Sequence, residues 1–257
     1  MSAAPDPERV QIITPEWPAP PGVRAAFTLR SGGVSAPPFD SLNLGAHVGD
    51  EAQAVAENRR RVRTQLRLPE EPAWMEQVHG IDVLDLDALA QTAANGFVTA
   101  DAALTRRTGR ICTVQVADCL PALLAARDGS AVAAAHAGWR GLAAGVLEAT
   151  VQSLAVEPGQ LVAWLGPGIG PAHFEVGEEV RRAFFMRDVA AAGAFTDNPR
   201  GRWQCDLVAL ARARLAALGV AAVFGGEWCT YADATRFFSY RRDGRCGRMA
   251  ALIWREG

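Results

Sequence analysis

Three short segments carry the side chains best suited to chemistry, and each lies where an apolar, strand-like run meets turn residues. They are QVHG at 77–80, ADCL at 117–120 and HAGWRG at 136–141. Two imidazoles and one thiolate form a ligand set that zinc uses in catalytic sites, where a fourth position stays open. Because ligands at neighbouring strand ends can converge above one edge of a sheet, these segments predict a metal site formed by His79, Cys119 and His136.

Each ligand alone also has an ordinary structural explanation. Free cysteine is among the most buried residue types, so Cys119 by itself would be interpreted as a core thiol. His79 could bond a nearby carbonyl, and His136 could be a core histidine within its alanine-rich run. The coincidence of three ligand types with three strand ends favours a shared site, in which Asp118 could hold a ligand or a substrate group. A zinc-bound water that attacks a substrate needs a nearby proton carrier, for which Asp118 and His47 are the candidates.

Two arginines are candidates for binding an anion. Arg30 precedes a Ser-Gly-Gly turn, and Arg140 follows Trp139 where a helix is expected to begin. A guanidinium group beside glycine-rich backbone can bind phosphate through two parallel hydrogen bonds. The glycine-rich run at 166–171 lacks both the GK[ST] ending and the third glycine of the nucleotide-binding loops, so it predicts only a rigid turn after a strand.

Composition sets the class of protein. The chain has 257 residues, 49% hydrophobic and 21% charged, with a net charge of −2, which is typical of a globular protein and does not predict a nucleic-acid partner. All basic residues are arginine, so a catalytic or phosphate-binding lysine is excluded. Five cysteines without a CxxC pair favour reduced thiols. Without a signal-like N-terminus or an apolar run of about 20 residues, we expect a cytoplasmic protein with no membrane partner.

The order of apolar runs and turn residues predicts an α/β fold. Residues 1–22 are proline-rich and are expected to be an extended, loosely attached lead-in to a single domain over 23–257. Strands are expected at 24–28, 74–79, 81–86, 101–105, 111–117, 121–126, 131–136, 161–165, 220–224, 236–241 and 248–254. Helices are expected at 50–67, 142–155, from 177 and at 205–218. This interleaving predicts a mixed β-sheet core between outer helices.

Two local predictions concern the helix expected at 50–67. Asp50 is positioned to cap its N-terminus, because a short acidic side chain before the first apolar residue can accept backbone N–H groups. The arginines at 59–61 and 63 are interpreted as a solvated helix face.

Beyond these features, motifs along nearly the whole chain resemble the laccase-domain, or multicopper polyphenol oxidase-like, family, which is regarded as a family of purine nucleoside phosphorylases. The N-terminal motifs are RSGGVS at 30–35, SLNLG at 41–45, HVGD at 47–50, ENRR at 57–60, QVHG at 77–80 and ADA at 100–102. The others are ADC at 117–119, HAGWRG at 136–141, GP at 166–167, IGP at 169–171, FEVG at 174–177, CTY at 229–231 and FFSYRRD at 237–243. The sequence departs from the family pattern at 172–173 and at Cys246.

The resemblance implies a single α/β domain with sheets between helices and a zinc ion held by a His/Cys/His triad, here His79, Cys119 and His136. It also implies phosphorolysis of adenosine, inosine, guanosine and S-methyl-5′-thioadenosine, together with adenosine deamination. Phosphate and purine nucleosides would be the small-molecule partners. In such a pocket Asn43 could bond the purine edge or the ribose, while Arg30, His47 and Arg140 would contact substrate.

Three rival functions stay open at this point. Four histidines are too few for a blue-copper site and a trinuclear cluster, but a single Cu²⁺ ion could replace Zn²⁺ at the triad and support phenol oxidation. Without a metal, Cys119 could be a nucleophile with His79 or His136 as base, in a hydrolase that edits cell-wall precursors. A non-catalytic nucleotide- or protein-binding module is the third. The preferred nucleoside and the oligomeric state are not determined by the sequence.

Overall fold

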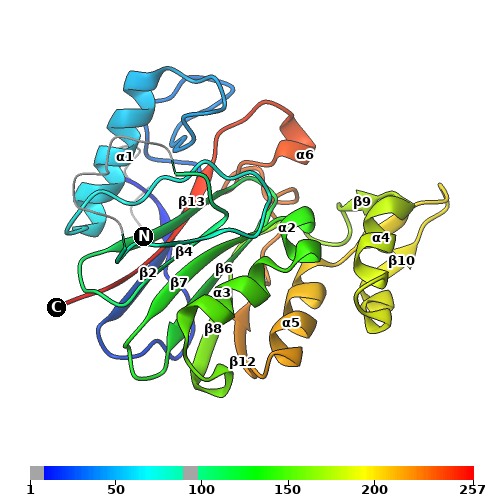
Figure 1. Ribbon diagram of the computed structural model, residues 1–257. Helices are drawn as coiled ribbons and strands as arrows, with labels where there is room; N and C mark the ends of the chain where they lie inside the picture. Colours follow the sequence, from blue (N-terminus) through cyan, green and yellow to red (C-terminus); the bar gives the residue numbers. More distant parts are fainter. Residues whose placement is uncertain (1–8, 89–97) are drawn as a thin grey trace, which may run out of the picture.

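The computed structural model describes residues 9–88 and 98–257. Two β-sheets pack face to face, and helices cover their outer faces (Figure 1). The apolar layer between the sheets contains Phe27, Trp164 and Phe237, all completely buried. This mixed α/β arrangement confirms the predicted fold class, because both sheets contribute one face to a shared core and the other face to a helix layer.

The larger sheet has six strands in the order β12-β8-β6-β7-β4-β3. Their bounds are β3 (Val83–Asp85), β4 (Ala102–Thr105), β6 (Leu120–Ala126), β7 (Val132–Ala137), β8 (Leu161–Leu165) and β12 (Ala222–Gly225). Its two edge pairs are parallel, and its central pairs are antiparallel. Every residue of β4, β6, β7 and β8 is buried, which explains why these strands are continuous apolar runs without alternation.

The smaller of the two stacked sheets is antiparallel throughout. Its order is β1 (Ile12–Ile13), β2 (Val23–Thr28), β13 (Met249–Arg255) and β5 (Ile111–Val116). The pairing of β1 with β2 and the burial of Val10 attach this part of the chain to the sheet. The described part of the lead-in at 9–22 is therefore not loose, contrary to our expectation.

Helices cover the two sheets from opposite sides. The apolar faces of α3 (Val146–Leu154) and α5 (Leu207–Ala217) pack on the six-stranded sheet, and α1 (Ala52–Leu66) packs on the four-stranded one (Figure 1). The helix expected at 142–155 is two helices, because Gly145, with φ of 108°, ends α2 (Trp139–Ala144) before α3 begins.

The remaining elements lie beside this four-layer body. A three-stranded antiparallel sheet of β9 (Glu175–Val176), β11 (Trp203–Cys205) and β10 (Phe195–Asp197) packs with α4 (Glu178–Phe185) at one side (Figure 1). The 3₁₀ turns η1 (Pro158–Gln160) and η2 (Val189–Ala194) and the short helix α6 (Tyr240–Asp243) complete the described elements.

Two expected strands are wrong. The run at 74–79 forms only an isolated bridge between Glu76 and Thr99, and 236–241 contains no strand but leads into α6. In both runs apolar side chains reach the core from irregular backbone, for example Met75 and Phe237, so their hydrophobicity reflects burial without ladder pairing. No helix in the described residues combines the length and the apolar character needed to span a bilayer.

The first local prediction for α1 is wrong, and the second holds for Arg60 and Arg63, which are exposed, but not for Arg59. Glu51 occupies the N-cap position without a capping side chain. The carboxylate of Asp50, one residue earlier, accepts hydrogen bonds from the Glu51 amide, the Ser35 hydroxyl and the Asn43 side chain. Arg59 does not face solvent: its guanidinium stacks 4.1 Å from the centre of the Trp74 ring and donates to a backbone carbonyl of the preceding loop. Burial lowers the pKa of Arg59 to about 10.

Candidate metal centre and pocket

Strand register brings two of the three expected ligands to one end of the six-stranded sheet. In the β6–β7 pair, Leu120 faces Ala137 and Pro121 faces His136, so Cys119 arrives beside the end of β7 that carries His136. The neighbouring strand β4 begins at the same end, and the His136 amide donates to the carbonyl of Asp101 at 2.7 Å. Antiparallel pairing thus places residues far apart in sequence at one sheet edge.

The third ligand, His79, lies on a tight turn before β3. Its φ of 62° is in the left-handed region, which is uncommon for a non-glycine residue and must be stabilised by its surroundings. The turn amides supply this stabilisation, because those of Val78, His79 and Gly80 donate to the Asp101 carboxylate at 3.2, 2.9 and 2.6 Å.

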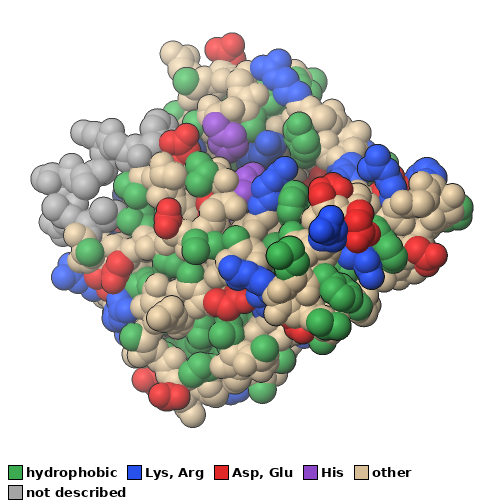
Figure 2. Space-filling view, turned by 45° about the vertical axis from the view of Figure 1, so that its right-hand side comes forward, with side chains coloured by type: hydrophobic (Ala, Val, Ile, Leu, Met, Phe, Trp, Pro, Cys, Tyr) green, Lys and Arg blue, Asp and Glu red, His purple; other side chains and the backbone are tan. Residues whose placement is uncertain are grey.

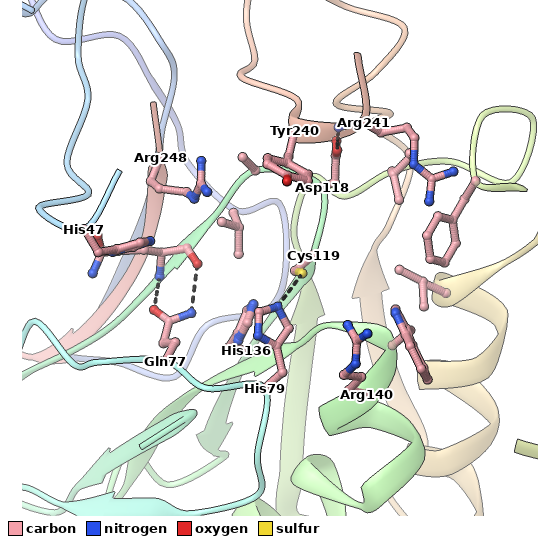
Figure 3. A pocket seen from close by; sticks show the side chains of 17 residues that line it. His47, Gln77, His79, Asp118, Cys119, His136, Arg140, Tyr240, Arg241 and Arg248 are labelled. Carbon is pink, nitrogen blue, oxygen red and sulfur yellow. Dashed lines mark hydrogen bonds between the residues drawn. The ribbon is translucent and has the colours of Figure 1, made fainter. Parts of the chain in front are cut away.

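His79, Cys119 and His136 converge as the sequence predicted. All their ligand atoms lie within 4.8 Å of one another, and Cys119 Sγ is 3.7 Å from His79 Nε2 (Figure 3). Zinc–nitrogen and zinc–sulfur bonds of about 2.1 and 2.3 Å in a tetrahedral centre place such atoms roughly 3.6 Å apart. His136 bonds Asp101 through Nδ1 at 2.8 Å, which leaves Nε2 as its ligand atom. Donor types and spacing therefore fit a metal ion.

Two glycines of the HAGWRG motif allow this convergence. A Cβ atom on Gly138 would lie 2.8 Å from Cys119 Sγ and 3.0 Å from His79 Cδ2, and one on Gly141 would lie 2.9 Å from the Gly80 carbonyl oxygen. Only glycine lets α2 begin this close to the ligands.

Without metal, the triad favours a thiolate beside an imidazolium. Burial by itself would raise the pKa of Cys119, but the charge of His136 and hydrogen bonds with His136 and His79 lower it to about 6. Burial by itself would lower the pKa of His136, but Cys119 and Asp101 raise it to about 9. Burial would likewise raise the pKa of Asp101, yet its bonds with His136 and the turn amides hold it below the ordinary value.

These ligands lie in a pocket of about 530 Å³, within the range of small-molecule sites. Its lining comprises His47, Gln77, His79, Gln115, Val116, Ala117, Asp118, Cys119, His136, Trp139, Arg140, Ile169, Phe174, Leu207, Tyr240, Arg241 and Arg248. Histidine side chains reach the surface with arginine side chains beside them (Figure 2). The pocket thus combines soft metal ligands, cationic groups and an apolar wall.

Two of the four expected substrate-binding residues line this pocket. Arg140 is exposed, its guanidinium lies 4.4 Å from the centre of the Trp139 ring, and it has no ion pair or hydrogen bond within the described residues. His47 lies beside Arg248 (Figure 3). Partial burial and the charges of Arg248 and Arg59 lower the pKa of His47, which keeps its imidazole neutral at pH 7.

Arg30 and Asn43 have structural partners and are not among the residues lining the pocket. The guanidinium of Arg30 donates to the carbonyls of Asp40 and Ala234 and stacks 4.7 Å from the Phe238 ring centre. Asn43 is completely buried, and its amide bonds the backbone of Gly45 and Arg248 as well as the Asp50 carboxylate.

Asp118 reaches the pocket wall but its carboxylate turns away from the triad. One oxygen accepts the Thr230 hydroxyl and the other accepts the Arg241 amide, both at 2.6 Å. Its φ of 96° is another left-handed backbone at the site. Asp118 therefore joins the strand end that carries Cys119 to the start of α6.

Several residues of the site were missed by reasoning from sequence. Arg241 and Arg248 line the pocket, as do Tyr240 and Gln77, whose amide pairs with both backbone groups of Gln115. Asp101 was recognised only as part of the ADA motif. A carboxylate directly before a buried strand indicates a buried charge that needs hydrogen-bond partners, and this pattern could have identified it.

The remaining histidine, His173, stacks on Tyr231 with ring centres 4.4 Å apart. Within the described residues, which include every histidine and cysteine of the chain, His79, Cys119 and His136 form the single candidate metal-binding group. Four histidines are too few to supply both a blue-copper site and a trinuclear cluster.

The chain is similar to known proteins over nearly its whole length. The family described as "Multi-copper polyphenol oxidoreductase laccase" matches residues 24–256. Purine nucleoside phosphorylase PA4543 of Pseudomonas aeruginosa is 55% identical, with 94% of this chain and 97% of the relative covered. Purine nucleoside phosphorylase YfiH of Escherichia coli is 52% identical, with coverages of 95% and 98%.

Solved structures show the same similarity. The Neisseria meningitidis protein NMB0706 has a TM-score of 0.91 and 46% identity, covering 96% of this chain and 99% of that one. YlmD of Geobacillus stearothermophilus has a TM-score of 0.82 and 31% identity, with coverages of 92% and 93%. The chain therefore belongs to the multi-copper polyphenol oxidoreductase laccase family, in which its similar curated relatives bear the name purine nucleoside phosphorylase.

Proposed function

We propose that this chain is a zinc-dependent purine nucleoside phosphorylase that also deaminates adenosine. The substrates would be adenosine, inosine, guanosine and S-methyl-5′-thioadenosine. Relatives more than 50% identical over nearly the whole chain carry the phosphorylase name. The observation that carries the proposal is one pocket of about 530 Å³ that holds both a His/Cys/His ligand group and an unpaired arginine, because phosphorolysis needs an anion and a nucleoside side by side.

Arginines supply the phosphate subsite in this proposal. Arg140 has no carboxylate partner within the described residues, so its full charge is available to an incoming phosphate. Arg241 and Arg248 each give one guanidinium nitrogen to backbone carbonyls and keep the other N–H groups for a ligand. Asp118 is the one carboxylate in the pocket lining, so the pocket attracts anions.

The metal would be held by His79, Cys119 and His136, whose thiolate and imidazole donors suit zinc. When bound, zinc supplies Lewis acidity, with which enzymes activate water or polarise a leaving group. Cu²⁺ binds the same donor types more strongly, so copper loading in vitro would be a substitution at this site. His47, neutral at pH 7, is the candidate proton carrier for deamination, since both oxygens of Asp118 already accept hydrogen bonds.

The decisive experiment incubates the purified zinc-loaded protein with adenosine, with and without inorganic phosphate. We expect adenine and ribose 1-phosphate only when phosphate is present, and inosine in both cases. Arg140→Ala should raise the KM for phosphate roughly 10- to 100-fold, as loss of a charge-assisted hydrogen bond does. Arg182→Ala, which removes an exposed arginine of α4 that is not in the pocket lining, is the matched control and should leave that KM unchanged.

Absence of phosphate-dependent base release would reject the phosphorylase, and an unchanged phosphate KM in Arg140→Ala would reject the subsite. A second function, a cysteine-dependent hydrolase acting on amide bonds such as those of cell-wall precursors, is favoured by the lowered pKa of Cys119. The two mechanisms respond oppositely to metal: removal of zinc by a chelator should abolish phosphorolysis, whereas a free Cys119 nucleophile would gain activity.

A further inference from the structure

Asp101 is a buried carboxylate whose partners all belong to the segments that carry the two histidines. Its side chain is 0% exposed, and no arginine neutralises it among the described residues. A buried carboxylate is strongly destabilising unless hydrogen bonds replace its hydration. Four bonds do so here, three from turn amides and one from His136 Nδ1.

The three amides are those of the turn that carries His79, and the side chains of this turn are largely exposed. Val78 is 54% exposed, and the side chain of His79 is exposed as well. The consecutive N–H groups of residues 78–80 point at one carboxylate, an arrangement that forms a small anion-binding concavity. The left-handed φ of His79 is therefore held in place by Asp101.

The same carboxylate also orients the second histidine. Asp101 Oδ1 accepts both the His79 amide at 2.9 Å and His136 Nδ1 at 2.8 Å. The ring of His136 cannot turn without breaking this bond, so Nε2 stays directed into the triad. One oxygen atom thereby fixes the positions of His79 and His136 relative to each other, and β4 anchors that atom to the sheet.

We propose that Asp101 is the positioning residue of the His79–Cys119–His136 metal site, and that it presets both histidines before the metal binds. This inference rests on the metal site of the proposed function, but not on the reaction that the site performs. Partners behind metal-bound histidines commonly change metal affinity 10- to 100-fold when they are mutated.

The test is zinc affinity in Asp101→Asn, measured by competition with a chromophoric chelator. Asparagine keeps the size of the side chain but turns one acceptor into a donor that faces backbone N–H groups. We expect zinc to bind roughly 10- to 100-fold more weakly. The Co²⁺-substituted variant should also show shifted visible absorption bands, because the geometry of its ligands changes.

Asp87→Asn is the matched control. Asp87 holds the other end of β4, where its carboxylate accepts hydrogen bonds from the Thr105 hydroxyl and the Arg106 amide. This variant should bind zinc and cobalt like the unmodified protein. Equal zinc affinity and equal cobalt spectra in Asp101→Asn and the unmodified protein would overturn the proposal. Because neither readout uses a nucleoside, a failure of the phosphorylase function would leave this result intact.

A second measurement covers the case in which Asp101→Asn does not fold. Hydrogen exchange of the 78–80 amides is followed in the unmodified protein after removal of metal. We expect slow exchange, because a buried carboxylate accepts all three amides. Exchange as fast as that of an exposed loop would show that the turn is not preset and would overturn the proposal.

Discussion

Cys119 is half-buried, whereas Cys112, Cys205 and Cys246 are buried, and its neighbours give its thiol a different pKa. Burial raises the pKa of Cys112 and Cys246 and raises that of Cys205 to about 12, so these thiols stay protonated. At Cys119 the positive charge of His136 and two hydrogen bonds outweigh the same effect and lower the pKa to about 6. Reactivity at this residue is thus set by which histidines the fold places beside it.

This difference predicts the pH dependence of alkylation in the metal-free protein. Because the thiolate reacts, the rate at Cys119 should rise with pH through about 6 and level off near neutrality. An ordinary thiol would still gain rate up to about pH 8.5. Mass spectrometry after iodoacetamide treatment measures the rate, and added zinc should suppress it.

His136→Ala should move this midpoint to higher pH, because it removes the stabilising charge. His173→Ala is the control, since that ring stacks on Tyr231 and is not part of the triad. A midpoint that stays near 6 in His136→Ala would contradict the assignment of the charge.

At the scale of elements, the loop at 31–50 depends on one residue of α1. Asn58 is completely buried; its side-chain oxygen accepts the Val34 amide, and its nitrogen donates to the Ser35 hydroxyl and to the carbonyls of Ser41 and Asn43. The loop carries His47 to the pocket, so α1 positions a pocket residue although none of its own residues lines the pocket.

Asn58→Ala should therefore destabilise the protein and impair the pocket. It removes the partner of the Val34 amide and of the Asn43 carbonyl, whereas the Ser41 carbonyl keeps the Ser35 amide. At about 1–3 kcal/mol for each of these two groups, urea unfolding should show a loss of roughly 2–6 kcal/mol. The KM for nucleoside should rise as well. Arg60→Ala is the control: Arg60 lies on the exposed face of the same helix and pairs, among the described residues, with Glu57 alone. This variant should change stability by less than about 0.5 kcal/mol. Equal losses in both variants would contradict this role for Asn58.

For the whole molecule, the candidate metal site joins segments far apart in sequence, so zinc binding there should raise global stability. Zinc at about 100 times its dissociation constant adds about 2.7 kcal/mol if it binds only the folded state. In a protein of this size that corresponds to a rise in Tm of roughly 5–10 °C. Calorimetry with and without zinc measures it, and Cys119→Ala should lose most of the rise. An undiminished rise in that variant would indicate binding elsewhere.

The sequence by itself determined the α/β class, most elements and the residue types of the candidate metal site. His79, Cys119 and His136 were identifiable because metal ligands at strand ends follow a local pattern, and buried strands such as 111–117 and 131–136 are continuous apolar runs. Their order along the chain then supported the resemblance to a known family. Such features are local, so they can be recognised from the sequence without knowledge of the tertiary structure.

Tertiary structure alone decided which polar groups serve the pocket. Arg30 and Arg140 looked equivalent in sequence. The guanidinium of Arg30 donates three hydrogen bonds to backbone carbonyls and stacks on the Phe238 ring, so it is not available to a ligand. Arg140 lines the pocket and has no hydrogen-bond or ion-pair partner within the described residues. Asp101 and Asn58 act through partners more than 20 residues away or on other elements. The partners of a buried polar group are chosen by register and packing across the fold, and no local pattern encodes them.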